Sequence, residues 1–80
     1  MRTAKAITVT FTRETKRYLR GSRGKIKKLE TFCVGESLTG VSTTNVVFVD
    51  GEPIECFDLL LASGDKVLRI PYASVFLLES

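Results

Sequence analysis

Cationic side chains dominate one short stretch of the chain, RETKRYLRGSRGKIKK (residues 13–28), which holds eight Lys or Arg and one acid. The chemistry open to such a stretch is polyanion binding, because each cation set against a phosphate releases a counterion and gives a salt-dependent affinity. The candidate phosphate contacts are Arg13, Lys16, Arg17, Arg20, Arg23, Lys25, Lys27 and Lys28. Tyr18 lies among them and is the aromatic placed to stack on a base, with packing against Leu19 as its alternative role.

The charge of the chain is divided between two parts. Residues 1–28 carry ten Lys or Arg and one acid, whereas residues 29–80 carry two bases and eight acids. Such an asymmetry is typical of a contact with nucleic acid. The simpler interpretation is a solvated face that keeps a small protein soluble.

The sequence offers little for catalysis. It contains no histidine, so it lacks the usual general base for a Ser or Cys nucleophile. Cys33 and Cys56 lie far apart in the apolar runs TFCV and IECF, which predicts two reduced core residues and no metal site. GSRGKI has too few residues between its glycines for a phosphate-binding P-loop. We therefore expect neither an enzyme nor a cofactor.

The elements that must position these side chains are strands. Eighty residues predict one domain, 1–80, with residues 1–28 as a basic N-terminal extension. AITVTFT alternates, with Ile7, Val9 and Phe11 on one face, and further strand-like runs follow it: LETFCVG, SLTGVSTTNVVFVDGEP, IECFDLLLA, KVLRI and SVFLLE. Because no helical period runs long, the predicted fold is mainly β, a small antiparallel β-barrel. No apolar run is long enough to span a membrane and the N-terminus lacks a signal-peptide core, so a cytoplasmic location without a membrane partner is expected.

The basic stretch itself has two interpretations. In a short helix, capped by Thr12 and ended by Gly21, four cations would share one face: Arg13, Lys16, Arg17 and Arg20. In a hairpin over residues 10–20, Glu14 and Thr15 would form the turn. The hairpin is preferred, and in both cases GSRG forms a flexible, cationic loop tip.

Two segments resemble a known family. Residues 35–40, GESLTG, have the G-x-x-L-x-G shape of the first hairpin of Sm/LSm-like proteins, including the bacterial Hfq branch, and an apolar strand precedes them. Residues 68–77, LRIPYASVFL, resemble the second Sm motif: a strand ending in a basic residue, a short turn, and a strand with an apolar start. The resemblance covers residues 29–79 and implies an Sm-like (SH3-like) antiparallel β-barrel, preceded here by a basic hairpin or short helix.

The same resemblance implies site residues and an assembly. Arg69 matches the basic position that contacts RNA near the pore of the ring, with a strand-end charge facing water as the alternative, and Tyr72 lies in the adjoining turn. Asp50 can match the Asp of the family's RNA-binding loop, but Glu52 and Pro53 do not look like a base-binding pair. The family forms rings by pairing edge strands, and the apolar end VFLLE suits a closed homo-oligomeric ring.

The resulting prediction is a non-catalytic protein that binds RNA or single-stranded DNA, with a role in RNA or DNA processing; the sequence does not distinguish RNA from DNA. Two alternatives remain open. RGSRGKIKKLE resembles the GXXG loop and following helix of a KH domain, which clamps a single strand. The chain could also be a β-barrel subunit of a larger assembly, such as a virion, whose basic segment contacts an acidic partner.

Overall fold

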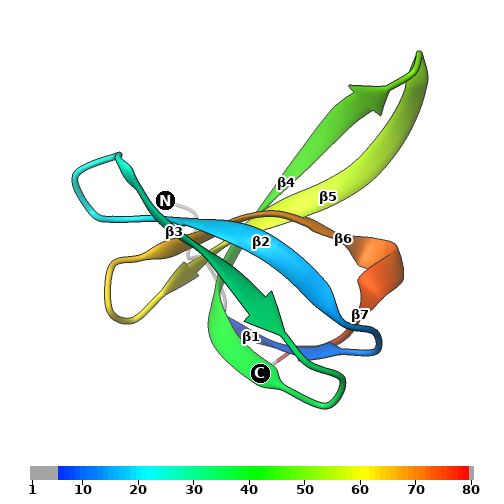
Figure 1. The fold of residues 1–80 in the computed structure, drawn as a ribbon. Coiled ribbons are helices and arrows are strands. Elements are labelled where there is room, and N and C mark those ends of the chain that lie inside the picture. The colour runs from blue at the N-terminus through cyan, green and yellow to red at the C-terminus, as the bar shows by residue number, and fades with distance from the viewer. Residues whose placement is uncertain (1–5, 80) are drawn as a thin grey trace, which may run out of the picture.

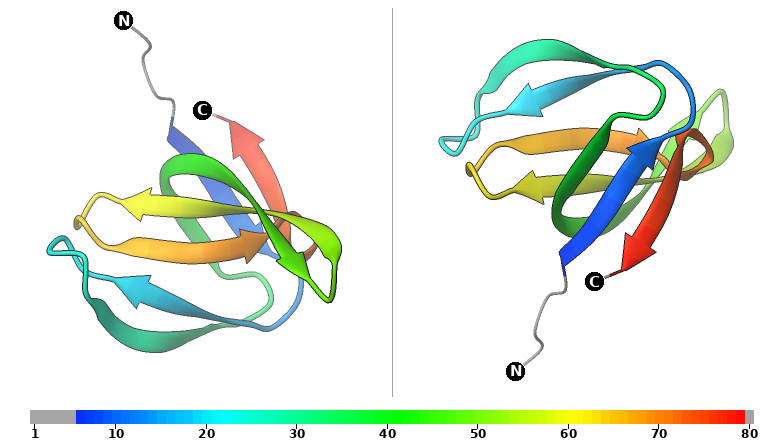
Figure 2. Two further views of the ribbon diagram at one scale, coloured as in Figure 1. Left: turned by 90° about the horizontal axis from the view of Figure 1, so that it is seen from above. Right: turned by 90° about the horizontal axis from the view of Figure 1, so that it is seen from below.

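The strands of the molecule form one curled sheet. The computed structural model describes residues 6–79, without the side chains of residues 45 and 79. Its elements are β1 (Ala6–Phe11), β2 (Thr15–Arg20), β3 (Ile26–Phe32), β4 (Ser37–Val49), β5 (Glu52–Leu61), β6 (Lys66–Pro71), the short 3₁₀ helix η1 (Tyr72–Ser74) and β7 (Val75–Glu79). All pairings are antiparallel, in the order β3-β2-β6-β5-β4-β1-β7, and the sheet curls into a half-barrel (Figures 1 and 2). The prediction of a mainly β, antiparallel fold is confirmed.

The core lies on the concave side of this sheet. The predicted alternation of β1 is confirmed, because Ile7, Val9 and Phe11 are all buried. They pack in one cluster with buried side chains from β2, β3, β5 and β6. The rings of Phe11 and Phe32 stack with their centroids 4.7 Å apart and their planes 6° apart. This contact, worth about 0.5–1.5 kcal/mol beyond the area that it buries, holds the end of β3 against β1.

The basic stretch is a hairpin, but its strands differ from those predicted. β2 pairs with β3, from Thr15 opposite Phe32 to Arg20 opposite Ile26, and it pairs on its other side with β6. Neither the short helix nor a hairpin over residues 10–20 forms, because both neighbours of β2 supply backbone partners and Leu19 joins the core. We call β2, β3 and their connecting turn the basic hairpin. The helix that a KH domain requires after the GXXG loop is also absent, since that segment is β3.

A second hairpin, β4–β5, extends away from the body of the sheet (Figure 1). Its pairing is continuous from Gly40 opposite Leu61 to Val49 opposite Glu52. Asp50 and Gly51, with φ of 51° and 79°, form its two-residue turn, in the left-handed conformations that a type I′ turn requires. We call residues 44–57 the arm.

Gly40 lies inside β4 and does not interrupt the strand. A Cβ on Gly40 would lie 2.3 Å from the backbone oxygen of Leu60. Glycine is therefore needed here for the close approach of β4 to β5 at the root of the hairpin.

The two cysteines have different environments. Cys56 is buried in β5, as predicted, but Cys33 follows the end of β3 and is exposed, so the prediction of a second core cysteine is wrong. The pairing of β3 with β2 ends at Phe32, one residue before Cys33. The chain then turns towards β4. Within the described range η1 is the single helical element, and no helix there is long and apolar enough to cross a membrane.

Candidate nucleic-acid interface

A bulge in β6 aims Arg69 away from the core. Phe57 opposes Ile70 and Leu59 opposes Val67, so one residue of β5, Asp58, faces two residues of β6. Arg69 occupies the bulge with a φ of 52°, in the left-handed region. This conformation costs a residue with a side chain about 1–3 kcal/mol, so its surroundings must hold it.

Two charged side chains hold the backbone of Arg69. The backbone N–H of Arg69 donates to Oδ1 of Asp58 at 2.9 Å, and its carbonyl oxygen accepts from Nη1 of Arg17 at 2.8 Å. Hydrogen bonds to charged groups contribute about 1.5–3 kcal/mol each, enough to offset the strain. Arg17 and Asp58 therefore position Arg69 from the two neighbouring strands.

Around this bulge lies a pocket of about 620 Å³, which we call the cationic pocket. Five strands contribute to it, and its lining residues are Arg17, Tyr18, Arg20, Ile26, Val46, Val47, Asp58, Leu68 and Arg69. The lining contains three arginines and one acid, Asp58, and the remaining residues are aromatic or aliphatic. The pocket thus combines excess positive charge with apolar surface.

The cationic pocket joins two sets of residues that the sequence suggested separately. Arg17, Tyr18 and Arg20 come from the basic stretch, and Arg69 comes from the segment resembling the second Sm motif. Sequence reasoning missed the aliphatic walls and Asp58. One available signal was the spacing of Val67 and Ile70, which are both buried although three residues apart, because residues on one face of a regular strand are two apart. No sequence signal pointed to Val46 and Val47, which reach the pocket through the course of the arm.

Tyr18 faces outward from β2. Its side chain is 52% exposed and stands opposite Leu29 of β3, whereas Leu19 is buried. The side chains of Tyr18 and Leu19 therefore lie on opposite faces of β2, because neighbouring residues of a strand point to opposite faces. The ring is free to contact a ligand from the wall of the pocket.

The tip of the basic hairpin forms a second, smaller pocket of about 310 Å³, lined by Gly21, Ser22, Arg23, Lys25, Lys27 and Asp65. The backbone N–H of Gly21 donates to Lys25 and that of Gly24 donates to Gly21, so the tip is a hydrogen-bonded turn. Arg23 and Lys25 are exposed and form no ion pair with any side chain that the structure describes.

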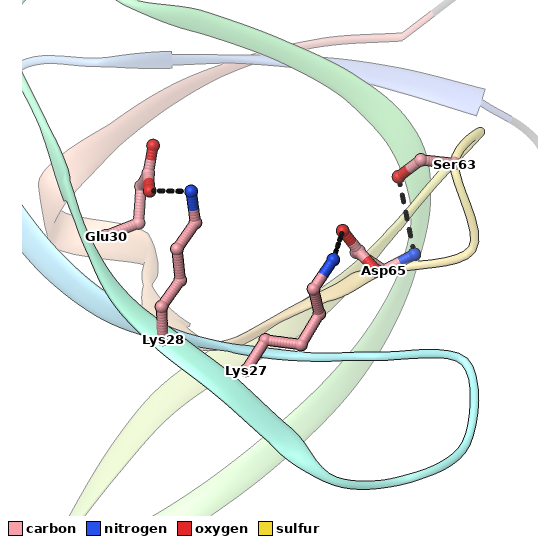
Figure 3. A network of polar contacts seen from close by, with 5 residues as sticks. All are labelled: Lys27, Lys28, Glu30, Ser63 and Asp65. Atoms are coloured by element: carbon pink, nitrogen blue, oxygen red, sulfur yellow. Dashed lines mark hydrogen bonds and ion pairs between the residues drawn. The ribbon is translucent and has the colours of Figure 1, made fainter.

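Two lysines of β3 are paired with acids of the same chain (Figure 3). Nζ of Lys27 lies 3.1 Å from Oδ2 of Asp65, and Nζ of Lys28 lies 3.0 Å from Oε2 of Glu30. Both pairs are solvent-exposed, so each contributes about 0–1 kcal/mol. A phosphate can displace such weak partners at low cost.

Three other predicted residues lie outside the cationic pocket. Arg13 is exposed in the connection between β1 and β2, and Lys16 is exposed on β2. Tyr72 lies in η1, where its ring packs against Phe57 at 4.8 Å and its hydroxyl is 3.1 Å from Oγ1 of Thr44. These contacts make Tyr72 a partner of the core.

The described residues contain no group of three or more His, Cys, Asp or Glu side chains arranged to hold a metal ion. Compared with protein-family models, curated proteins and solved structures, the chain shows no significant match. What the site binds is therefore inferred from its own geometry and charge.

Proposed function

We propose that this chain is a non-catalytic nucleic-acid-binding protein, a small Sm-like β-barrel that binds RNA or single-stranded DNA across the cationic pocket. The observation that carries the proposal is the meeting of Arg17, Arg20 and Arg69 with the exposed ring of Tyr18 in one pocket. Guanidinium groups bind phosphate oxygens through two parallel hydrogen bonds. An exposed aromatic ring stacks on any unpaired base.

The shape of the pocket favours a single strand. Its walls include Ile26 and Leu68, which offer apolar contact to the face of a base without reading its edge. A base can reach Tyr18 only when it is unstacked and unpaired, which is the state found in single strands, loops and bulges. Arg23 and Lys25, at the tip of the basic hairpin, extend the cationic surface for the flanking phosphates.

Two features support the Sm-like part of the proposal. β6 ends just after Arg69, η1 forms the short turn, and β7 begins at Val75, which follows the pattern of the second Sm motif. Leu38 of the G-x-x-L-x-G segment packs against the core. The basic hairpin, inserted between β1 and β4, has no counterpart in a minimal Sm protein, and it supplies most of the cations.

The proposal includes a homo-oligomeric ring formed by edge strands. In the described sheet, β3 and β7 each have one neighbour, and Phe76 and Leu78 of β7 are exposed. An edge strand of this kind can pair with a second chain. A ring would repeat the cationic pocket around an axis, so that individually weak phosphate contacts add through effective concentration.

A filter-binding titration with a single-stranded oligonucleotide, repeated at several salt concentrations, tests the function. For single strands, each lost phosphate contact should lower the slope of log affinity against log salt by about 0.7. The double variant Arg20→Ala/Arg69→Gly should therefore lower the slope by about 1.4. It should also weaken the affinity about tenfold or more. Arg69→Gly removes the guanidinium while keeping the left-handed backbone accessible.

The matched control is Arg13→Ala, which removes an exposed arginine outside the pocket and should change the affinity less than about threefold. If Arg13, Arg20 and Arg69 each contributed equally to the affinity, the binding site would be a diffuse cationic face and not the pocket. An absence of binding at about 50 mM salt would overturn the proposal. Stronger binding of poly-glutamate than of oligonucleotide would favour the alternative, an assembly subunit with an acidic protein partner.

A further inference from the structure

The arm exposes apolar side chains on both of its faces. Val46 and Phe48 share one face and Val49 and Ile54 share the other, because cross-strand partners and alternate residues point the same way. Phe48 is 69% exposed, and the other three are also exposed. A projecting hairpin with this much apolar surface is typical of an interaction site.

The arm is also acidic. It contains Asp50, Glu52 and Glu55 and no Lys or Arg, and the chain has no cation between residues 29 and 65. All three acids are exposed. The surface that covers the arm must therefore be both apolar and basic.

This chain carries such a surface on the basic hairpin. Tyr18, Ile26 and Leu29 are each about half exposed, and they stand among the cations of β2 and β3. Tyr18 and Ile26 line the cationic pocket together with its three arginines. The basic hairpin thus matches the arm in charge and in apolar character.

The root of the arm lines the cationic pocket through Val46 and Val47, but its tip cannot reach this surface within its own chain. Its ladder is continuous up to the turn at Asp50 and Gly51, so the acids near the tip cannot fold back. The tip of the arm and the turn of the basic hairpin also lie at opposite sides of the molecule (Figures 1 and 2). A second copy of the chain can supply the matching surface.

We propose that the arm of one chain docks on the cationic pocket of a second copy, with its acids in the place of phosphates. The pocket reaches Val46 and Val47, and about 13 Å of strand separates Val46 from the turn at Asp50. Two arms lying antiparallel about a two-fold axis would set the tip of each over the pocket of the other. One symmetric contact then satisfies both arms and closes a dimer.

This contact differs from ring formation because it uses the faces of a hairpin rather than the edges of a sheet. It does not depend on the proposed nucleic-acid binding, but it uses the same cations. Oligonucleotide and second copy should therefore compete, so that saturating oligonucleotide releases the docked arm. The acids of the arm would keep the pocket occupied until a stronger polyanion arrives.

Charge-reversal variants of the full chain, studied by sedimentation equilibrium at low salt, test the proposal. Glu52→Lys and Arg20→Glu should each weaken self-association at least tenfold, and an equimolar mixture of the two should associate again. The mixture restores one contact of the original kind and creates one with its charges exchanged. Glu14→Lys and Arg13→Glu are matched controls, because each makes the same charge change at an exposed residue outside the arm and the pocket, and each should associate like the wild type.

Three results would overturn the docking: a wild-type chain that is monomeric at about 100 μM, variants that associate as strongly as the controls, or a mixture that fails to associate. Phe48→Ser gives a second measurement independent of charge, and it should also weaken association. If the chain is monomeric yet binds oligonucleotide, the docking is wrong and the proposed function stands. If the chain associates as described but binds no oligonucleotide, the proposed function is wrong and the docking stands.

Discussion

The basic hairpin and the arm are built from the same motif, two antiparallel strands and a tight turn, yet the molecule treats them differently. The basic hairpin is attached to the body, since β2 pairs with β6 and the ring of Phe32 stacks on Phe11. Between Val46 and Glu55, the two strands of the arm pair only with each other within the described sheet. The attached hairpin therefore has a backbone fixed on two sides, whereas the projecting one leaves its acids and apolar side chains exposed.

The largest expected effect detaches the basic hairpin from the core. Leu19→Ala should lower the free energy of unfolding by about 2–5 kcal/mol, because it leaves a cavity where a buried leucine packs. Phe48→Ala, in the arm, should change it by less than about 0.5 kcal/mol, because that ring is exposed. Urea denaturation followed by circular dichroism, at low protein concentration so that self-association adds nothing, compares the two. Equal costs would show that the arm is as integral to the fold as the basic hairpin.

Gly40→Ala tests the root of the β4–β5 hairpin, which carries the arm. The new Cβ would meet the backbone oxygen of Leu60 at 2.3 Å, and forcing β4 and β5 apart should cost about 1–3 kcal/mol. Gly51→Asn, at the tip, keeps a residue that tolerates the left-handed conformation and should cost less than about 1 kcal/mol. Thermal unfolding of the two variants measures the difference. A Gly40→Ala variant as stable as the wild type would contradict the close approach of β4 and β5.

The bulge predicts a coupling between Asp58 and Arg69. Asp58→Ala should cost about 1–3 kcal/mol, because it removes the acceptor that holds the strained N–H of Arg69. In an Arg69→Gly background the same change should cost at least about 0.5 kcal/mol less, because glycine adopts the conformation without support. A double-mutant cycle of urea unfolding measures this coupling. Strict additivity would mean that Asp58 does not hold the bulge.

The smallest expected effect lies at the surface ion pair of the basic hairpin. Lys27→Ala removes the contact with Asp65 and should change the free energy of unfolding by less than about 1 kcal/mol. Because exposed pairs are screened, that small difference should disappear near 1 M salt. Urea titrations at low and high salt check this, and a large difference that survives high salt would contradict a merely superficial pair.

The sequence predicted the class of the fold and located the basic stretch, but it did not show how the strands of that stretch pair with the rest of the sheet. Alternation placed Ile7, Val9 and Phe11 in the core, because a period of two needs no knowledge of the partner strand. It could not show that β2 pairs with β6, since that pairing joins residues about fifty positions apart and depends on the curl of the whole sheet.

Only some residues of the cationic pocket could be named from the sequence, because the pocket depends on long-range strand pairing. The charge of the basic stretch identified Arg17 and Arg20 as candidate phosphate contacts, and the resemblance to the second Sm motif implied Arg69; the structure brings these three into one pocket. Tyr72 was expected at the site from its place after Arg69, but the turn of η1 directs its ring against Phe57. The bulge carries no glycine and depends on Asp58 of the neighbouring strand, so its one local signal was the three-residue spacing of the apolar Val67 and Ile70.

Tyrosine fluorescence reports directly on nucleic-acid binding in the cationic pocket, because Tyr18 lines it. The chain has two tyrosines and no tryptophan, so a Tyr72→Phe variant emits from Tyr18 alone. Titration with a single-stranded oligonucleotide at low salt should quench this emission as bases stack on the ring, and salt should restore it. Emission that stays constant while filter binding saturates, or the absence of any binding at low salt, would contradict the account.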